Sequence, residues 1–82
     1  MKLNNKMDAT AEKELNLRRS ANTVAIVMKA DKMNVGDEKS FRIIDANVWQ
    51  RVKTRLSRLG QDKNRSYFTK LEGNKIKVRR GA

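Results

Sequence analysis

Apolar residues between Asp45 and Gly60 recur at the period of an α-helix. Asp45 is a suitable N-cap residue, because its carboxylate can accept hydrogen bonds from the unpaired amides of a first helical turn, and Gly60 is a natural stop. Asn47 with Gln50 offers an alternative capping box, which would start the helix two residues later. The pattern predicts a helix over 46–59 whose buried stripe consists of Val48, Trp49, Val52, Leu56 and Leu59.

Residues 66–80 alternate between apolar and polar side chains, which is typical of a β-hairpin. Gly73-Asn74 fits a two-residue type II′ turn, in which glycine supplies the positive φ of the first position. Such a turn fixes the register of the two strands. The predicted pairs are Glu72–Lys75, Leu71–Ile76, Lys70–Lys77, Thr69–Val78 and Phe68–Arg79. The strand face that can pack on the helix holds Tyr67, Thr69, Leu71, Ile76 and Val78.

The N-terminal part of the chain has a less regular pattern. Residues 8–20 predict a short helix, with Asp8 as its cap. Residues 22–30, with the sequence NTVAIVMKA, are rich in β-branched side chains and apolar on both faces, which predicts a central or dimer-forming strand. A loop around Gly36-Asp37 then leads to a second short strand at 40–44.

These elements predict an α+β fold. A small antiparallel sheet with a C-terminal β-hairpin packs on one main amphipathic helix, and the N-terminal helix is peripheral. Residues 1–20 would be a flexible N-terminus with a short helix, and residues 21–82 a single small domain. A chain of 82 residues has only a small core, which leaves a homodimer open. The expected core residues are Ile26, Phe41, Ile43, Val48, Trp49, Val52, Leu56, Leu59, Leu71, Ile76 and Val78.

Composition narrows the range of functions. The chain has 20 Lys and Arg against 9 Asp and Glu, a net charge of +11, which favours a polyanionic partner. It has neither cysteine nor histidine, so disulfides, thiolate zinc sites and the commonest general base are excluded. We therefore expect a protein that is not an enzyme and needs no metal or cofactor. No apolar run approaches the roughly 20 residues that span a bilayer, so we expect a cytoplasmic protein without a membrane partner.

A second stripe of the predicted main helix carries the first candidate site. Arg51, Arg55 and Arg58 gather there with Asn47 and Thr54, a quarter to a third of a turn from the apolar stripe. Arginine side chains bind phosphates, and both arginine and asparagine can also read base edges. The alternative interpretation is an ordinary solvated helix face.

The hairpin carries the second candidate site, on the face that does not pack on the helix. Lys70 lies directly opposite Lys77, and two like charges in that position repel unless an anion relieves them. Phe68 on the same face can stack on a base. The alternative is that Phe68 packs under the N-terminal helix and the lysines keep the sheet edge soluble. With the loop between helix and hairpin, the further candidate anion-binding residues are Lys63, Arg65, Phe68, Lys70, Lys77 and Arg79.

The order of basic helix, basic loop and basic hairpin is similar to the order of recognition helix and wing in winged-helix proteins. The segments VGDEKSF, WQRVKTRLSRLGQDKNR and YFTKLEGNKIKVRR, within residues 35–80, also resemble small basic proteins encoded by phages and mobile elements. This resemblance implies a phage-type origin, and hence the host cytoplasm, but no particular activity.

The sequence therefore predicts a non-catalytic nucleic-acid-binding protein, with DNA preferred over RNA. A phage-type inhibitor of host defence is the alternative, which would bind an acidic host protein or sequester a small anionic nucleotide. A minor structural protein of a virion or nucleoprotein particle is a third interpretation. The basic helix face and the basic hairpin would form one surface in the leading hypothesis.

Overall fold

The computed structural model describes the backbone of residues 2–82 and the side chains of residues 11–82. It confirms the α+β fold, with two helices and a three-stranded antiparallel sheet. Along the chain the elements are α1 (Lys2–Asp31), β1 (Glu38–Arg42), α2 (Ala46–Lys63), β2 (Tyr67–Glu72) and β3 (Lys75–Arg80).

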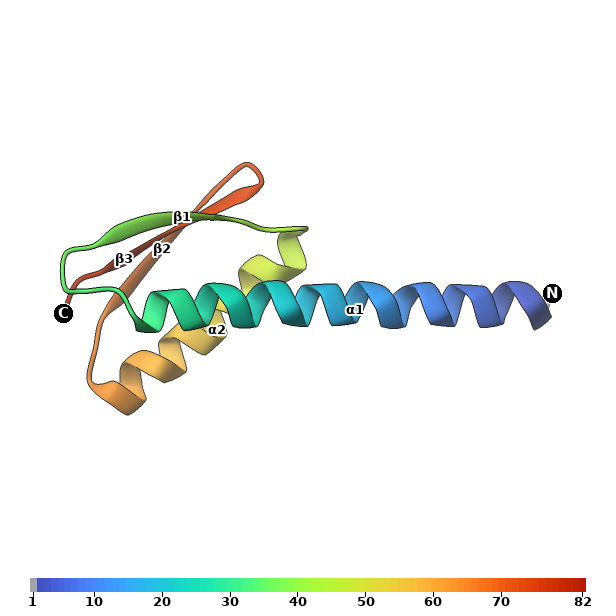
Figure 1. Ribbon diagram of the computed structural model, residues 1–82, viewed down its shortest axis with the longest axis horizontal. Helices are drawn as coiled ribbons and strands as arrows, with labels where there is room; N and C mark the ends of the chain where they lie inside the picture. The colour runs from blue at the N-terminus through green and yellow to red at the C-terminus, as the bar shows by residue number, and fades with distance from the viewer. Residues whose placement is uncertain (1) are drawn as a thin grey trace.

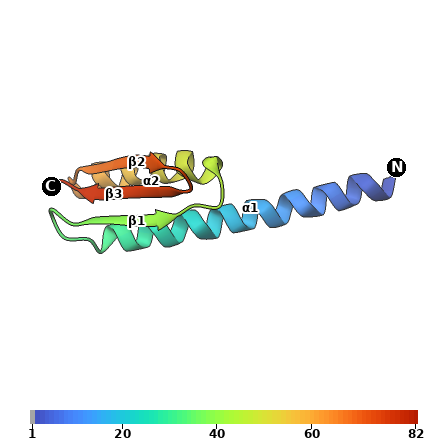
Figure 2. The same cartoon turned by 90° about the horizontal axis from the view of Figure 1, so that it is seen from above.

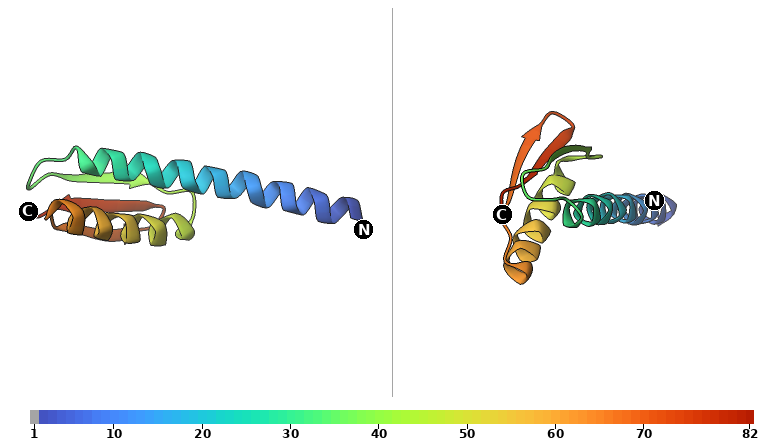
Figure 3. Two further views of the ribbon diagram at one scale, coloured as in Figure 1. Left: turned by 90° about the horizontal axis from the view of Figure 1, so that it is seen from below. Right: turned by 60° about the vertical axis from the view of Figure 1, so that its left-hand side comes forward.

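The molecule has two layers. Both helices lie on one side of the sheet, with α2 beneath β2 and β3 and with α1 along the edge formed by β1 (Figures 1 and 2). The N-terminal half of α1 extends well beyond the sheet and α2, which gives the molecule dimensions of 53 × 26 × 15 Å (Figure 3). One helix and one strand precede α2, so the element order is not that of a winged-helix domain, which has further helices there.

The sheet has the order β1-β3-β2, so the last strand in the chain is central. All five predicted pairs of the hairpin are confirmed, from Glu72–Lys75 to Phe68–Arg79. Gly73 has a φ of 61° and Asn74 has no positive φ, as a type II′ turn requires. Strand β1 lies two residues earlier than the short strand predicted at 40–44, and it pairs with β3.

The predicted strand at 22–30 is wrong, because these residues form the last turns of α1. The helix also begins well before Asp8, so Asp8 is not its cap. The β-branched side chains cost some helix propensity, but Thr23, Ile26 and Ala30 follow one another at helical spacing and all three are buried. The Thr23 hydroxyl donates to the Arg19 carbonyl one turn earlier. Burial of this face outweighs local preference, and the division of the chain after residue 20 falls inside one continuous helix.

Helix α2 begins as predicted and ends later. The Asp45 carboxylate accepts hydrogen bonds from the amides of Asn47 and Val48. The end at Gly60 is wrong: the helix continues to Lys63, and Asn64 closes it in the left-handed conformation with φ 56°. Gly60 is buried inside the helix, where a Cβ would lie 2.6 Å from the backbone oxygen of Arg65. Glycine is needed there for close approach of the following loop, and not to stop the helix.

The core lies between the helices and the inner face of the sheet. Most of the expected core residues are buried or half-buried, but Leu71 is wrong, because its side chain near the hairpin turn is 40% exposed. Ala30 and Met33 are core residues that the strand prediction missed. The buried apolar residues are Ile26, Ala30, Met33, Ile43, Val48, Val52, Leu56, Ile76 and Val78, with Val27, Phe41, Trp49, Leu59 and Tyr67 packed around them.

Substitution of Gly60 by alanine tests the close approach at the end of α2. At an ordinary helical position this change stabilises by about 1 kcal/mol, but here the new methyl group would overlap the Arg65 carbonyl. We expect Gly60→Ala to lower the free energy of unfolding by about 1–3 kcal/mol, the usual cost of overpacking, in urea denaturation followed by circular dichroism.

The matched control is Gln61→Ala, at the neighbouring exposed position of the same helix. It should leave the free energy of unfolding unchanged or slightly higher. A stabilised Gly60→Ala variant would contradict the packing described for this loop.

Candidate anion-binding site

A groove between α1 and α2 brings together the candidate residues of the main helix. Its volume is about 440 Å³. All five residues predicted for the basic stripe line it, and α1 supplies the opposite wall. The lining residues are Ser20, Thr23, Asn47, Gln50, Arg51, Thr54, Arg55 and Arg58.

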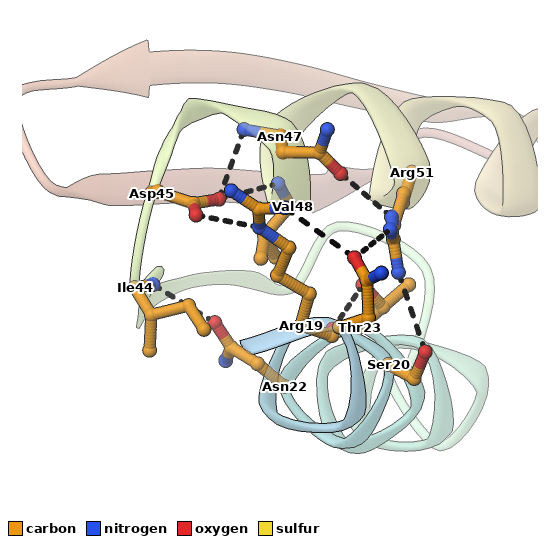
Figure 4. A network of polar contacts seen from close by, with 10 residues as sticks. Arg19, Ser20, Asn22, Thr23, Ile44, Asp45, Asn47, Val48 and Arg51 are labelled. Atoms are coloured by element: carbon orange, nitrogen blue, oxygen red, sulfur yellow. Dashed lines mark hydrogen bonds and ion pairs between the residues drawn. The ribbon is translucent and has the colours of Figure 1, made fainter. Parts of the chain in front are cut away.

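Arg51 is held across the groove by neutral partners. Its Nε donates to Asn47 Oδ1 at 2.7 Å, and its two terminal nitrogens donate to Ser20 Oγ at 3.3 Å and to Asn16 Oδ1 at 3.4 Å (Figure 4). These bonds orient the guanidinium but leave its positive charge uncompensated. An anion in the groove would therefore meet a charged donor that is already positioned.

Arg55 and Arg58 add two more cations along the same helix. Both side chains are exposed, and neither makes a hydrogen bond or an ion pair with a described residue. The three arginines follow one another at intervals of about one turn, 4.5–6 Å along the axis. No carboxylate is among the described residues that line the groove, so its local charge is strongly positive.

Asp45 and Asn22 fix the two walls of the groove relative to each other. Asp45 caps α2 and at the same time accepts from Arg19 Nε of α1 at 2.7 Å. Asn22 of α1 accepts from the Ile44 amide and donates to the Arg42 carbonyl. These contacts join α1 to the segment that leads into α2 (Figure 4). Hydrogen bonding from Arg19, with help from the two capping amides, lowers the pKa of Asp45 from its ordinary value of 3.8.

Lys63 and Arg65 lie outside the groove and already have a carboxylate partner. Both form ion pairs of 2.7 Å with Asp31, the last residue of α1. Arg65 also donates to the Asp31 carbonyl and contacts the hydroxyl of Tyr67. Hydrogen bonding from Lys63, and then from Arg65, lowers the pKa of Asp31. The two cations thus tie the end of α1 to the loop after α2, and their role in anion binding stays a prediction.

The four hairpin candidates do gather, on the outer face of the sheet. Phe68 is 60% exposed, so it does not pack under the N-terminal helix. With Lys70, Lys77 and Arg79 it lines a shallow depression of about 300 Å³. Glu72 lies 3.4 Å from the Lys77 ammonium and 3.9 Å from that of Lys70. The repulsion between the two lysines is therefore relieved within the protein, and no external anion is needed to explain it.

The expectation of one continuous basic surface is wrong. The groove lies between α1 and α2, within the helix layer, whereas Phe68, Lys70, Lys77 and Arg79 line a depression on the face of the sheet that does not pack on α2. The alternation of side chains along a strand produces this separation, because the residues that pack on α2 and the basic residues point to opposite faces. The molecule has two separate cationic surfaces.

The groove also contains residues that the sequence did not indicate. Ser20 and Thr23 of α1 line it, and Asn16 holds Arg51. Their spacing in the sequence could have indicated that they lie together, since positions 16, 20 and 23 share one face of a helix. The wrong prediction of a strand at residues 22–30 prevented this inference.

Neither metal coordination nor relationship to a known protein assigns a function to these surfaces. Among the described side chains, no group of three or more acidic residues could hold a metal ion. No helix in the described part of the chain is long and apolar enough to cross a membrane. Comparison of the chain with protein-family models, with curated protein sequences and with solved structures found no match.

Asp45→Asn tests the ion pair that joins the two helices. Asparagine is as good an N-cap as aspartate, so the change removes mainly the pairing with Arg19. Because the pKa of Asp45 is lowered in the folded protein, the pair stabilises the fold fully above about pH 3.8, and this contribution is lost as the pH falls through the lower, folded-state value. We expect the variant to be less stable than the wild type at pH 7, with a difference in thermal midpoint that shrinks in acid below pH 3.8.

Asp62→Asn is the control, since this exposed aspartate of α2 forms no ion pair with a described residue. It should leave the midpoint unchanged at both pH values. A difference between Asp45→Asn and the wild type that is equally large at neutral and acidic pH would contradict the assigned ion pair.

Proposed function

We propose that this protein binds nucleic acid through the groove between α1 and α2, without catalysing a reaction. The observation that supports this most is the set of three arginines that lines one groove, with no carboxylate among its described lining residues. Phosphate groups satisfy such an array, because each guanidinium offers several donors in a planar fork. Duplex DNA is the preferred ligand in this proposal, and RNA is the comparison.

The positions of the arginines favour a chain of phosphates. Arg51, Arg55 and Arg58 are distributed over two turns of α2, about 10 Å along the helix axis, so they can contact more than one phosphate. Asn47 and Gln50 add amide groups beside them. Phosphate contacts position the ligand, while amide side chains can contact base edges.

The outer face of the sheet is a weaker candidate than the groove. Two of its cations, Lys70 and Lys77, already share Glu72, and Glu38 also lines its depression. Phe68 is the one feature that favours nucleic acid there, as an exposed ring on which a base can stack. We assign this surface a secondary role, as an additional contact for a ligand that is held elsewhere.

A small anionic nucleotide is the second candidate ligand. The groove has about 440 Å³, which falls within the range of small-molecule sites, and its arginines would surround the phosphates. An acidic protein surface would meet the same charges. Saturable binding of a mononucleotide with one ligand per chain, without binding of duplex DNA, would favour sequestration of a nucleotide over nucleic-acid binding.

The triple substitution of Arg51, Arg55 and Arg58 by glutamine tests the groove. Each phosphate contact contributes about 0.9 to the slope of log K against log salt for duplex DNA. Loss of three contacts should therefore weaken binding most at low salt and reduce the slope by about 2–3. Fluorescence anisotropy with labelled duplex DNA, duplex RNA and single-stranded DNA over a series of salt concentrations measures both quantities.

The matched control replaces Lys70, Lys77 and Arg79 by glutamine, which removes the same three charges from the opposite surface. It should lower affinity much less and keep most of the slope. If this variant lost binding while the groove variant kept it, the site would be on the sheet. If the wild type bound none of the three nucleic acids at low salt, the proposed function would be excluded.

A further inference from the structure

Helix α1 carries an apolar stripe that none of the described residues covers. Leu17 is 71% exposed, Met28 57% and Val24 38%, and Ala21 between them is also exposed. The core side of the same helix, with Thr23, Ile26 and Ala30, is displaced from this stripe by almost half a turn. The second half of α1 therefore has two apolar faces, and only one is used within the domain.

The stripe follows the seven-residue repeat of a coiled coil. Ala21 and Met28 occupy one core position of the repeat, and Leu17 and Val24 occupy the other. In the sequence the same spacing continues to Met7 and Leu3, interrupted by Thr10 and Glu14. Six of eight core positions are thus apolar over almost four heptads, the length at which such a pattern indicates a coiled coil.

The projecting half of α1 also needs a partner for its stability. Residues 11–15 are all exposed and lie beyond the sheet and α2 (Figure 1). A helical segment of this length is marginal in water when only its own hydrogen bonds hold it. A second helix laid along the stripe would bury its apolar side chains and stabilise the projecting turns.

We propose that the stripe is the dimer interface of this protein, occupied by α1 of a second copy in antiparallel orientation. This inference is independent of the proposed function, because the stripe includes none of the groove's arginines. A second copy is the occupant that the charges of α1 favour. Residues 8–14 hold three acidic residues and one basic residue, whereas residues 15–30 hold three basic residues and none that is acidic.

Glu14 decides the orientation. In a parallel pair, Glu14 would face Glu14 of the second copy inside the interface, and Lys13 would approach Arg18 of the second copy, so both contacts would repel. In an antiparallel pair with Leu17 opposite Glu14 of the second copy, each Glu14 lies beside the Arg18 of the other chain. The acidic part of each helix then covers the basic part of its partner.

The mass of the full chain in solution tests the dimer. Analytical ultracentrifugation at high salt, after nuclease treatment, should give twice the chain mass, and the thermal midpoint should rise with protein concentration. The double variant Leu17→Glu/Met28→Glu should be monomeric. Its domain should remain folded by circular dichroism, since both side chains are largely exposed and absent from the core.

Leu15→Glu is the control for an added carboxylate, because it places one such charge on α1 but lies almost half a turn from Leu17. It should leave the dimer intact. A wild type that is monomeric at all concentrations, with a midpoint independent of concentration, would overturn the proposal. So would a dimer that persists in the double variant or one that forms only when nucleic acid is present.

Cysteine crosslinking tests the orientation, since the chain has no cysteine of its own. In the antiparallel pair, position 21 lies opposite position 10 of the second copy. A mixture of Ala21→Cys and Thr10→Cys chains should form a mixed disulfide on oxidation, whereas Ala21→Cys alone should not crosslink. Rapid crosslinking of Ala21→Cys alone would show a parallel pair and overturn the antiparallel assignment.

Discussion

The groove exists because α1 and α2 are held side by side, and the Asp45 carboxylate is the group that connects them. One of its oxygens caps α2 through two backbone amides, and the other accepts from Arg19 of α1. The start of one helix and the position of the other therefore depend on a single side chain. The apolar core, which includes Ile26 and Ala30 of α1 and Val48 and Val52 of α2, supplies the buried surface, while the polar contact fixes how the helices meet. Arg51 can reach both walls because this relation is fixed.

Local rules predicted α2 and the hairpin well because both are determined by neighbouring residues. A capping aspartate and an apolar stripe define the start and the buried face of a helix, and a two-residue turn with glycine defines a register. Helix α1 was mispredicted because its second half is determined by tertiary packing, which outweighs the strand preference of Val24, Ile26 and Val27. The role of Gly60 was mispredicted for a similar reason. The sequence shows a glycine, but only the folded chain shows that it leaves space for the following loop and does not supply a left-handed helix end.

For the candidate sites too, the sequence predicted what neighbouring residues determine and missed what tertiary packing determines. The five residues of the α2 stripe were found together because they belong to one helix face, and the hairpin residues because they belong to one strand face. The relation between these faces depends on how the layers stack, which the sequence did not indicate. Compensating charges were also missed: Asp31 engages Lys63 and Arg65, and Glu72 engages Lys77, in contacts that only the folded chain brings together.

The position of cations in both layers of the molecule affects how it would approach a charged partner. The arginines of α2 line the groove between the helices, and the basic residues of the sheet line the depression on its outer face, so the positive charge is not gathered on one side. A net charge of +11 then attracts a polyanion from a distance without turning the molecule to present one particular side. The orientation of the protein on a polyanion would then be set by contacts at short range. There the groove differs from the sheet, because it offers the fixed guanidinium of Arg51 and neighbouring amides.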